Sequence, residues 1–249
     1  MRILLTNDDG IMAEGIYTMA RELEKEHEVI IIAPDSERSA QSQAITIGSA
    51  LIVKEVQLDG LKNTSYSVSG TPADCVRVGF DKLIEGDIDM VVSGTNKGSN
   101  AGMDILYSGT VSAAIEANIY KKPSIAVSAK EMHGNCRFDL AAKYTSLLLD
   151  KTKDQHKDSK ILLNLNVPYM EDEPKGVKVC PIGDTMLDYY VMKISKDGIR
   201  SVQVEGRTEI EYTDGTDRYF LNAGYVTVTP LKYDLTNFDL LDEVEAWMK

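Results

Sequence analysis

Short, unbroken apolar runs, each followed by a stretch with helical periodicity, constrain the fold of this chain more than any other feature. Residues 3–6 form such a run, and in residues 16–23 the apolar side chains recur at the i, i+3, i+4 and i+7 spacing of an amphipathic helix. The run VIIIAP at 29–34 is typical of a strand buried on both faces of a parallel sheet. The chain therefore opens with a strand, a helix and a second strand.

The alternation continues as far as residue 168. Further strands are predicted at 89–94, 124–129 and 161–168, and helices at 73–84, 111–120 and 140–149. Strands that alternate with helices favour a parallel sheet with right-handed crossovers. The predicted fold class is α/β, with a doubly wound, mostly parallel, Rossmann-like sheet.

The pattern changes after Pro168. The segments YYVMKIS and IRSVQVE flank Asp197-Gly198, a strong signal for a hairpin with a two-residue turn. No further helix is expected before the C-terminal LLDEVEAWMK. We expect an α/β body over residues 1–168 that carries the site, and a β-rich extension over 169–249 with a hairpin and a C-terminal helix. Both hairpin faces carry apolar side chains, so the hairpin should pack on its own body or on a second copy of the chain.

The charge balance restricts the partners. The 249 residues carry 27 Lys and Arg against 39 Asp and Glu, a formal net charge of −12. A surface this acidic repels nucleic-acid backbones and anionic membranes, so neither is an expected partner. Any anionic ligand must be bound locally, by a metal ion or by backbone N–H groups. The three dispersed cysteines and the lack of a signal-peptide pattern predict a cytoplasmic protein.

Polar residues gather where the predicted strands end. Asp8 and Asp9 follow the first strand, Ser39 lies in the loop after the second, and Asn96 follows the run DMVVSG. Ligands of open parallel sheets bind beyond the carboxyl ends of the strands, so these residues should converge. Two carboxylates, a hydroxyl and an amide suit Mg²⁺ or Mn²⁺ better than zinc. The three histidines share no ligand spacing.

Asp8 and Asp9 also have an explanation without a metal. An Asx turn with a helix N-cap accounts for one aspartate, although not for the second. With a metal, an activated water is the simplest nucleophile, and Asp8 or Asp9 could serve as its base. Asp104 is a candidate proton donor because of its place in the following glycine-rich loop.

That loop is SGTNKGSNAGMDILYSGTVSAA, residues 93–114. It matches neither the dinucleotide-binding nor the P-loop pattern. Its glycines allow backbone N–H groups to approach an anion, and a helix N-terminus favours phosphate. An ordered turn with Ser108 as N-cap accounts for the loop equally well. The candidate phosphate- or substrate-binding residues are Asn7, Gly94, Thr95, Ser108, Gly109 and Thr110.

Five blocks together resemble the SurE family of survival-protein 5'-nucleotidases: ILLTNDDG, APDSERSAQSQAIT, VSGTPADCV, the loop quoted above and GYVTVTPL. They occur in order between residues 3 and 231. The resemblance implies a SurE-like fold and divalent-metal-dependent hydrolysis of nucleoside monophosphates, with some members active on 3'-nucleotides or polyphosphate. It places the metal ligands at Asp8, Asp9, Ser39 and Asn96. It also implies a homodimer or homotetramer that exchanges the extension.

Two other classes fit less well. A receiver-type signalling domain also has an acidic pair after its first strand, but it needs a phosphoacceptor aspartate at a later strand end. Asp59 is the only nearby candidate, and the chain is about twice as long as that module. A haloacid-dehalogenase-like phosphatase needs an aspartate two positions after its nucleophile, where this chain has Gly10 or Ile11.

Overall fold

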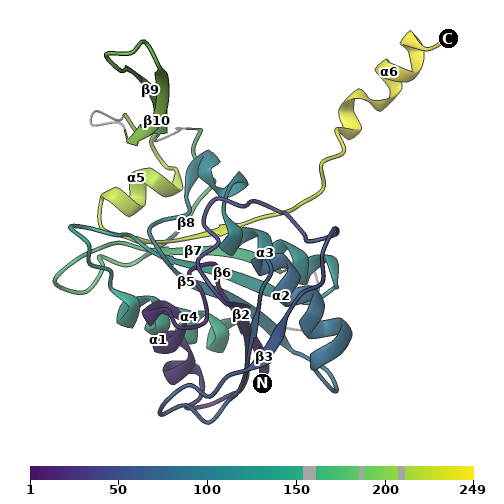
Figure 1. The fold of residues 1–249 in the computed structure, drawn as a ribbon, viewed down its shortest axis with the longest axis vertical. Coiled ribbons are helices and arrows are strands. Elements are labelled where there is room, and N and C mark those ends of the chain that lie inside the picture. The colour runs from purple at the N-terminus through teal and green to yellow at the C-terminus, as the bar shows by residue number, and fades with distance from the viewer. Residues whose placement is uncertain (154–160, 185–187, 207–210) are drawn as a thin grey trace.

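A nine-stranded mixed sheet forms the centre of the molecule, in the strand order β3-β4-β2-β1-β5-β6-β7-β11-β8 (Figure 1). The structure is a computed structural model that describes residues 1–153, 161–184, 188–206 and 211–249. One of the three histidines, His156, lies outside the described residues. The strands of this sheet are β1 (Arg2–Thr6), β2 (Glu28–Pro34), β3 (Val53–Glu55), β4 (Thr64–Val68), β5 (Met90–Lys97), β6 (Ser124–Ala129), β7 (Leu162–Val167), β8 (Val177–Val179) and β11 (Val226–Pro230).

The sheet is doubly wound, as the sequence predicts. From β1 the chain moves outward to β2 and β4, then returns to pair β5 with the other side of β1 and continues to β6 and β7. All of these pairings are parallel. The strand order therefore reverses at β1 and β5, and the carboxyl ends of these two strands border the crevice where such sheets bind ligands.

Helices cover both faces of the sheet (Figure 1). The helices that the structure describes are α1 (Glu14–Leu23), α2 (Pro72–Val78), α3 (Gly109–Ile119), α4 (Phe138–Thr152), α5 (Asp217–Asn222) and α6 (Leu241–Trp247), of which α6 lies away from the sheet. There are also a π-helical turn over Gly79–Leu83 and 3₁₀ turns over Gly102–Leu106 and Phe238–Leu240. Ile3 and Leu5 of β1 pack on the side of α1 and α4, whereas Leu4 packs on the side of α2 and α3. Burial on both faces explains why the strands read as unbroken apolar runs. None of the helices within the described ranges has the length and hydrophobicity of a membrane-crossing segment.

The main sheet does not end at residue 168, where the sequence predicted the end of the body. β11 returns to pair antiparallel with β7, and β8 then pairs parallel with β11. α5 lies beside β11 and was not expected at all. A helix of six residues is too short to show a periodic apolar pattern, and tertiary packing supplies its stability. Residues beyond 168 thus contribute strands and a helix to the body itself.

The predicted hairpin forms a separate two-stranded sheet of β9 (Asp188–Ile194) and β10 (Arg200–Gly206). Its loop has three residues between the bonded pair Ser195 and Ile199, one more than predicted. Gly198 adopts φ 78°, the left-handed conformation that such a loop requires. The hairpin and the C-terminal α6 both project from the body, and an extended segment separates α6 from it (Figure 1).

Candidate active site

Residues from two loops and from the end of a strand meet at the carboxyl edge of the sheet. Asp8 follows β1, Ser39 lies in the loop after β2, and Asn96 lies near the end of β5. All three line one cavity of about 630 Å³. Asp9 lines an adjoining smaller cavity, and Lys97 borders both. The strand ends that the sequence indicated therefore do converge in space.

Asp8 is 4% exposed, and its carboxylate is held by the start of α3. Thr110 donates to it twice, from its hydroxyl at 2.5 Å and from its backbone N–H at 3.2 Å. Burial and, to a smaller extent, the neighbouring charge of Asp9 together raise the pKa of Asp8 to about 6, against the lowering effect of the hydrogen bonds from Thr110. Gly109 packs directly on this carboxylate, since a Cβ there would lie 3.0 Å from the Cβ of Asp8.

Asp9 accepts a hydrogen bond from the backbone N–H of Lys97 at 2.9 Å. Burial raises its pKa, and the charge of Glu37 adds to that effect. Two adjacent carboxylates thus lie where each is costly to ionise. A bound cation would remove this cost, because an opposite charge favours the ionised form.

The neighbouring side chains also suit a cation. The amide nitrogen of Asn96 donates to the carbonyl of Gly98 at 2.7 Å, which leaves the amide oxygen as a ligand. The hydroxyl of Ser39 donates to Glu37 at 2.6 Å, which leaves its oxygen lone pairs. Across the ranges that the structure describes, no group of three or more His, Cys, Asp and Glu side chains could share a metal. The donors that these side chains offer are carboxylate, hydroxyl and amide oxygens, which suit Mg²⁺ or Mn²⁺ better than zinc.

The predicted phosphate-binding residues occupy different places. Ser108 lines the cavity and caps α3, accepting from the N–H of Val111 at 3.1 Å. Gly109 begins α3 between Ser108 and Thr110. Thr110 and Thr95 are fully buried, and Thr110 contacts Asp8 behind the cavity.

Asn7 and Gly94 lie below the same edge. The amide nitrogen of Asn7 donates to the carbonyl of Gly10 at 2.9 Å, while its amide oxygen is buried without a partner. Gly94 packs against β6, where a Cβ would lie 2.3 Å from the carbonyl oxygen of Val127. Direct phosphate contact by these residues and by Thr95 and Thr110 stays a prediction.

Asp104 lines the cavity, and Arg218 of α5 forms an ion pair with it. Arg218 is buried and comes from the part of the chain that the sequence assigned to the extension. Nothing in the sequence pointed to Arg218, because α5 lacks a periodic signal. The pairing places a residue from beyond position 168 in contact with the cavity wall.

Asn100 is a second lining residue that sequence reasoning missed. Its backbone N–H donates to Asn166 at 3.0 Å and its amide to Ser128 at 2.9 Å. Its carbonyl accepts from the amides of Asn164 and Asn166. The sequence did carry a signal for such a contact. Asn164 and Asn166 alternate with apolar residues in β7, and buried amides require polar partners.

The family model described as Survival protein SurE matches residues 3–188 of this chain. The chain belongs to the SurE family. A protein of Clostridium tetani named 5'-nucleotidase SurE is 50% identical over 248 residues, which cover 99% of this chain and 100% of that protein. A protein of Clostridium kluyveri with the same name is 47% identical over 248 residues, 98% of this chain and 97% of the relative.

The fold agrees with the SurE family as well. The crystal structure of the SurE protein from Aquifex aeolicus matches with a TM-score of 0.87 and 32% identity, and the match covers 100% of both chains. The resemblance that the sequence blocks indicated is thereby confirmed, together with the α/β fold class.

Proposed function

We propose that this chain is a 5'-nucleotidase that hydrolyses nucleoside monophosphates with the help of a divalent cation. The observation that carries the proposal is the convergence of two adjacent carboxylates of raised pKa with a hydroxyl and an amide, beside the N-terminus of α3. Membership of the SurE family and the names of the Clostridium relatives support the activity. Hydrolysis of 3'-nucleotides and of polyphosphate belongs to the same proposal.

Asp8, Asp9, Ser39 and Asn96 would hold the cation, and Mg²⁺ or Mn²⁺ suits their oxygens. When bound, it supplies positive charge for the phosphate and activates water for attack on phosphorus. The start of α3 carries the positive end of the helix dipole, which favours phosphate oxygens nearby. Ser108 lines the cavity at this point.

Proton transfer falls to the carboxylates of the cavity. Asp8 or Asp9 is the candidate base, since both carboxylates lie where the cation would activate water. Asp104 is the candidate donor to the leaving group. Its contact with Arg218 holds the carboxylate at the cavity wall.

The cavity suits a nucleotide in size and in lining. Its volume of about 630 Å³ is that of a typical small-molecule site. Tyr107 and the hairpin residues Tyr189, Tyr190 and Val204 contribute aromatic and apolar surface on which a nucleoside can pack.

We further propose a homodimer or homotetramer. The exposed side chains Tyr190, Met192, Ile194, Val202 and Val204 share one hairpin face, and α6 presents the exposed Leu241, Val244 and Trp247. Exposed apolar surface on two projecting elements favours an interface. The free cysteines support a location in the reducing cytoplasm. The acidic net charge argues against a membrane or a nucleic-acid polymer as partner.

Phosphate release from a panel of nucleoside 5'- and 3'-monophosphates and polyphosphate, with and without chelator, tests the function. We expect release from 5'-monophosphates that stops with chelator and returns with Mg²⁺ or Mn²⁺. Full activity in chelated protein would contradict the metal requirement. Absence of release from every 5'-monophosphate in metal-supplemented buffer would contradict the assigned substrate class.

A further inference from the structure

The segment from 35 to 50, here called the Ser39 loop, carries one candidate metal ligand and contains no helix or strand. Ala40 and Ser42 adopt φ values of 55° and 52°, which are uncommon outside glycine. Ser42 forms two hydrogen bonds with the turn before α3. Its backbone N–H donates to the carbonyl of Tyr107 at 3.0 Å, and its hydroxyl donates to the carbonyl of Leu106 at 2.7 Å. The position of Ser39 thus depends on contacts made elsewhere along the loop.

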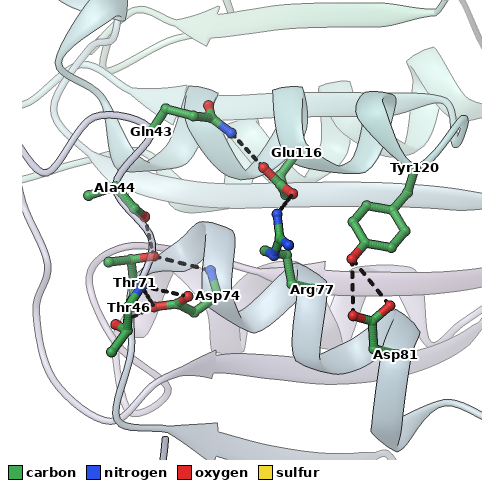
Figure 2. A network of polar contacts seen from close by, with 9 residues as sticks. All are labelled: Gln43, Ala44, Thr46, Thr71, Asp74, Arg77, Asp81, Glu116 and Tyr120. Carbon is green, nitrogen blue, oxygen red and sulfur yellow. Dashed lines mark hydrogen bonds and ion pairs between the residues drawn. The ribbon is translucent and has the colours of Figure 1, made fainter. Parts of the chain in front are cut away.

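One of these contacts reaches a buried carboxylate. Glu116 lies on α3 and is 3% exposed. Its two oxygens have separate partners, because the amide of Gln43 donates to one at 2.8 Å and the guanidinium of Arg77 donates to the other at 3.1 Å (Figure 2). A buried carboxylate needs such partners, since an unpaired one is costly. Glu116 therefore joins the Ser39 loop, α2 and α3.

A second carboxylate anchors the far end of the loop. Asp74 accepts from the backbone N–H of Thr46 at 3.0 Å and from its hydroxyl at 2.7 Å, and it also forms the capping box of α2 with Thr71 (Figure 2). The hydroxyl of Thr71 donates to the carbonyl of Ala44 at 2.7 Å. Asp74 thus has a structural task of its own in starting α2, whereas the bond from Gln43 to Glu116 connects only the loop to α3.

We propose that Glu116 is a positioning residue for the cation site, which it holds together through Gln43. α3 carries Thr110, which contacts Asp8, and six residues later carries Glu116, which contacts the Ser39 loop. The backbone N–H of Arg38 also joins the loop directly to the carbonyl of Asp8 at 2.7 Å, and α3 adds a second connection between Asp8 and the Ser39 loop. This inference rests on the proposed metal-dependent function, and it assigns to a buried residue outside the cavity a role in assembling the cavity.

An exchange of the two side chains tests the proposal. Gln43→Glu places two carboxylates where a hydrogen bond of 2.8 Å now lies, and their repulsion should displace the loop. In the double variant Gln43→Glu/Glu116→Gln, an amide again faces a carboxylate with donor and acceptor reversed. The amide that this variant carries at position 116 still offers Arg77 an acceptor oxygen.

The readouts are the Mn²⁺ dissociation constant from electron paramagnetic resonance, kcat and KM, and the unfolding midpoint of the metal-free protein. We expect Gln43→Glu to weaken Mn²⁺ binding and to lower kcat/KM by about tenfold, as losses of residues that orient metal ligands do. The double variant should recover most of both losses. The unfolding midpoint of the metal-free protein shows whether each variant is folded under the conditions of the Mn²⁺ measurement. An added negative charge by itself would strengthen Mn²⁺ binding, so weakening identifies displacement.

Gln41→Glu is the matched control, because it adds the same charge to the same loop two residues away from the contact. It should bind Mn²⁺ at least as tightly as the wild type. If Gln43→Glu does not fold, Gln43→Ala removes the bond without added charge and should shift Mn²⁺ affinity in the same direction.

Unchanged Mn²⁺ affinity in Gln43→Glu or Gln43→Ala, or a double variant no better than Gln43→Glu, would overturn the inference. Wild-type protein that binds Mn²⁺ but releases no phosphate would instead overturn the proposed function. The binding measurements would still decide the role of Glu116 in that case.

Discussion

Thr110 at the start of α3 donates two hydrogen bonds to Asp8 at the end of β1, from its hydroxyl at 2.5 Å and from its backbone N–H at 3.2 Å. The two residues are 102 positions apart in the sequence. Their contact joins the first strand to the helix that follows the glycine-rich loop. Thr110 is fully buried, and its hydroxyl is directed at this carboxylate.

Replacement of Thr110 by valine tests this assignment. Thr110→Val keeps the shape of the side chain but leaves Asp8 without its shortest hydrogen bond, which for a charged acceptor is worth about 1.5–3 kcal/mol. We expect the apparent affinity for the divalent cation and kcat/KM to fall, with less effect than removal of an aspartate. Activity measured against Mg²⁺ or Mn²⁺ concentration checks the expectation.

Thr110→Ser is the matched control, because it retains the hydroxyl and removes only a methyl group. It should behave nearly as the wild type in the same titration. If Thr110→Val equals wild type in cation affinity, kcat and KM, the hydroxyl has no part in the site and the backbone N–H alone suffices.

Asp9 offers a more severe test. Asp9→Asn keeps the acceptor for the N–H of Lys97 but removes the charge that a cation needs. We expect a loss of about 3–4 kcal/mol in transition-state stabilisation, a factor of several hundred in kcat. Phosphate release from the best nucleotide of the panel measures it. Undiminished release by Asp9→Asn would contradict a role for Asp9 in the metal site.

Much of this arrangement could be predicted from the sequence, because it depends on strand ends. Apolar runs locate the strands, and a parallel sheet brings their carboxyl ends to one edge. The sequence therefore predicts that Asp8, Ser39 and Asn96 lie close together, and in the structure they line one cavity. Ser108 was also predicted as an N-cap and does cap α3.

The residues that support the site could not be predicted in the same way. Arg218 lies on a six-residue helix that packing stabilises, and Glu116 lies within a predicted helix whose buried face shows no strong periodicity. Their partners, Asp104 and Gln43, are more than 70 positions away in the sequence. Pairings of this kind depend on how helices cross the sheet, and no local pattern encodes that.

The raised pKa of Asp8 gives the metal-free protein a defined pH dependence. Its folded pKa of about 6 lies above the ordinary value of 3.8, so the folded state binds a proton more tightly than the unfolded state. This contribution to stability is present below pH 4 and is lost as pH rises through 6. Asp9, whose pKa is also raised, adds an effect of the same sign.

We therefore expect Asp8→Asn, without metal, to gain stability relative to the wild type by roughly 1–2 kcal/mol between pH 5 and 7.5. Urea unfolding of both proteins in the presence of chelator measures the difference at each pH. Subtracting the two free energies of unfolding removes the contributions of titratable groups that both proteins share. Asp139, whose pKa is lowered by its hydrogen bond with Arg137, is one such group. A difference that does not vary with pH, or that shrinks as pH rises, would contradict the raised pKa.

The exposed face of the hairpin leads to a prediction about assembly. Tyr190 pairs with Val204 and Met192 with Val202, so these side chains lie on one face, where Tyr190 is 75% exposed and Met192 56%. A two-stranded hairpin is marginal in water and needs a surface to pack on. A second copy of the chain can provide it by exchange of the same element, which gives a closed two-fold dimer.

We expect a dimer or larger assembly by light scattering at micromolar concentration. Deletion of residues 189–205 with a short Gly-Ser linker should give smaller and less stable particles. Met192→Glu should lower the mass in the same way, because it places a charge within the apolar face. The mass of the particle is the readout rather than activity, because Tyr190 and Val204 also line the cavity.

Ser201→Glu is the matched control for the hairpin face, since Ser201 pairs with Lys193 on the opposite face and a glutamate there would meet an opposite charge. Its particle mass should equal that of the wild type. A wild-type protein that stays monomeric at these concentrations would rule out the exchange. If the deletion variant assembles as the wild type does, the interface lies elsewhere than on the hairpin.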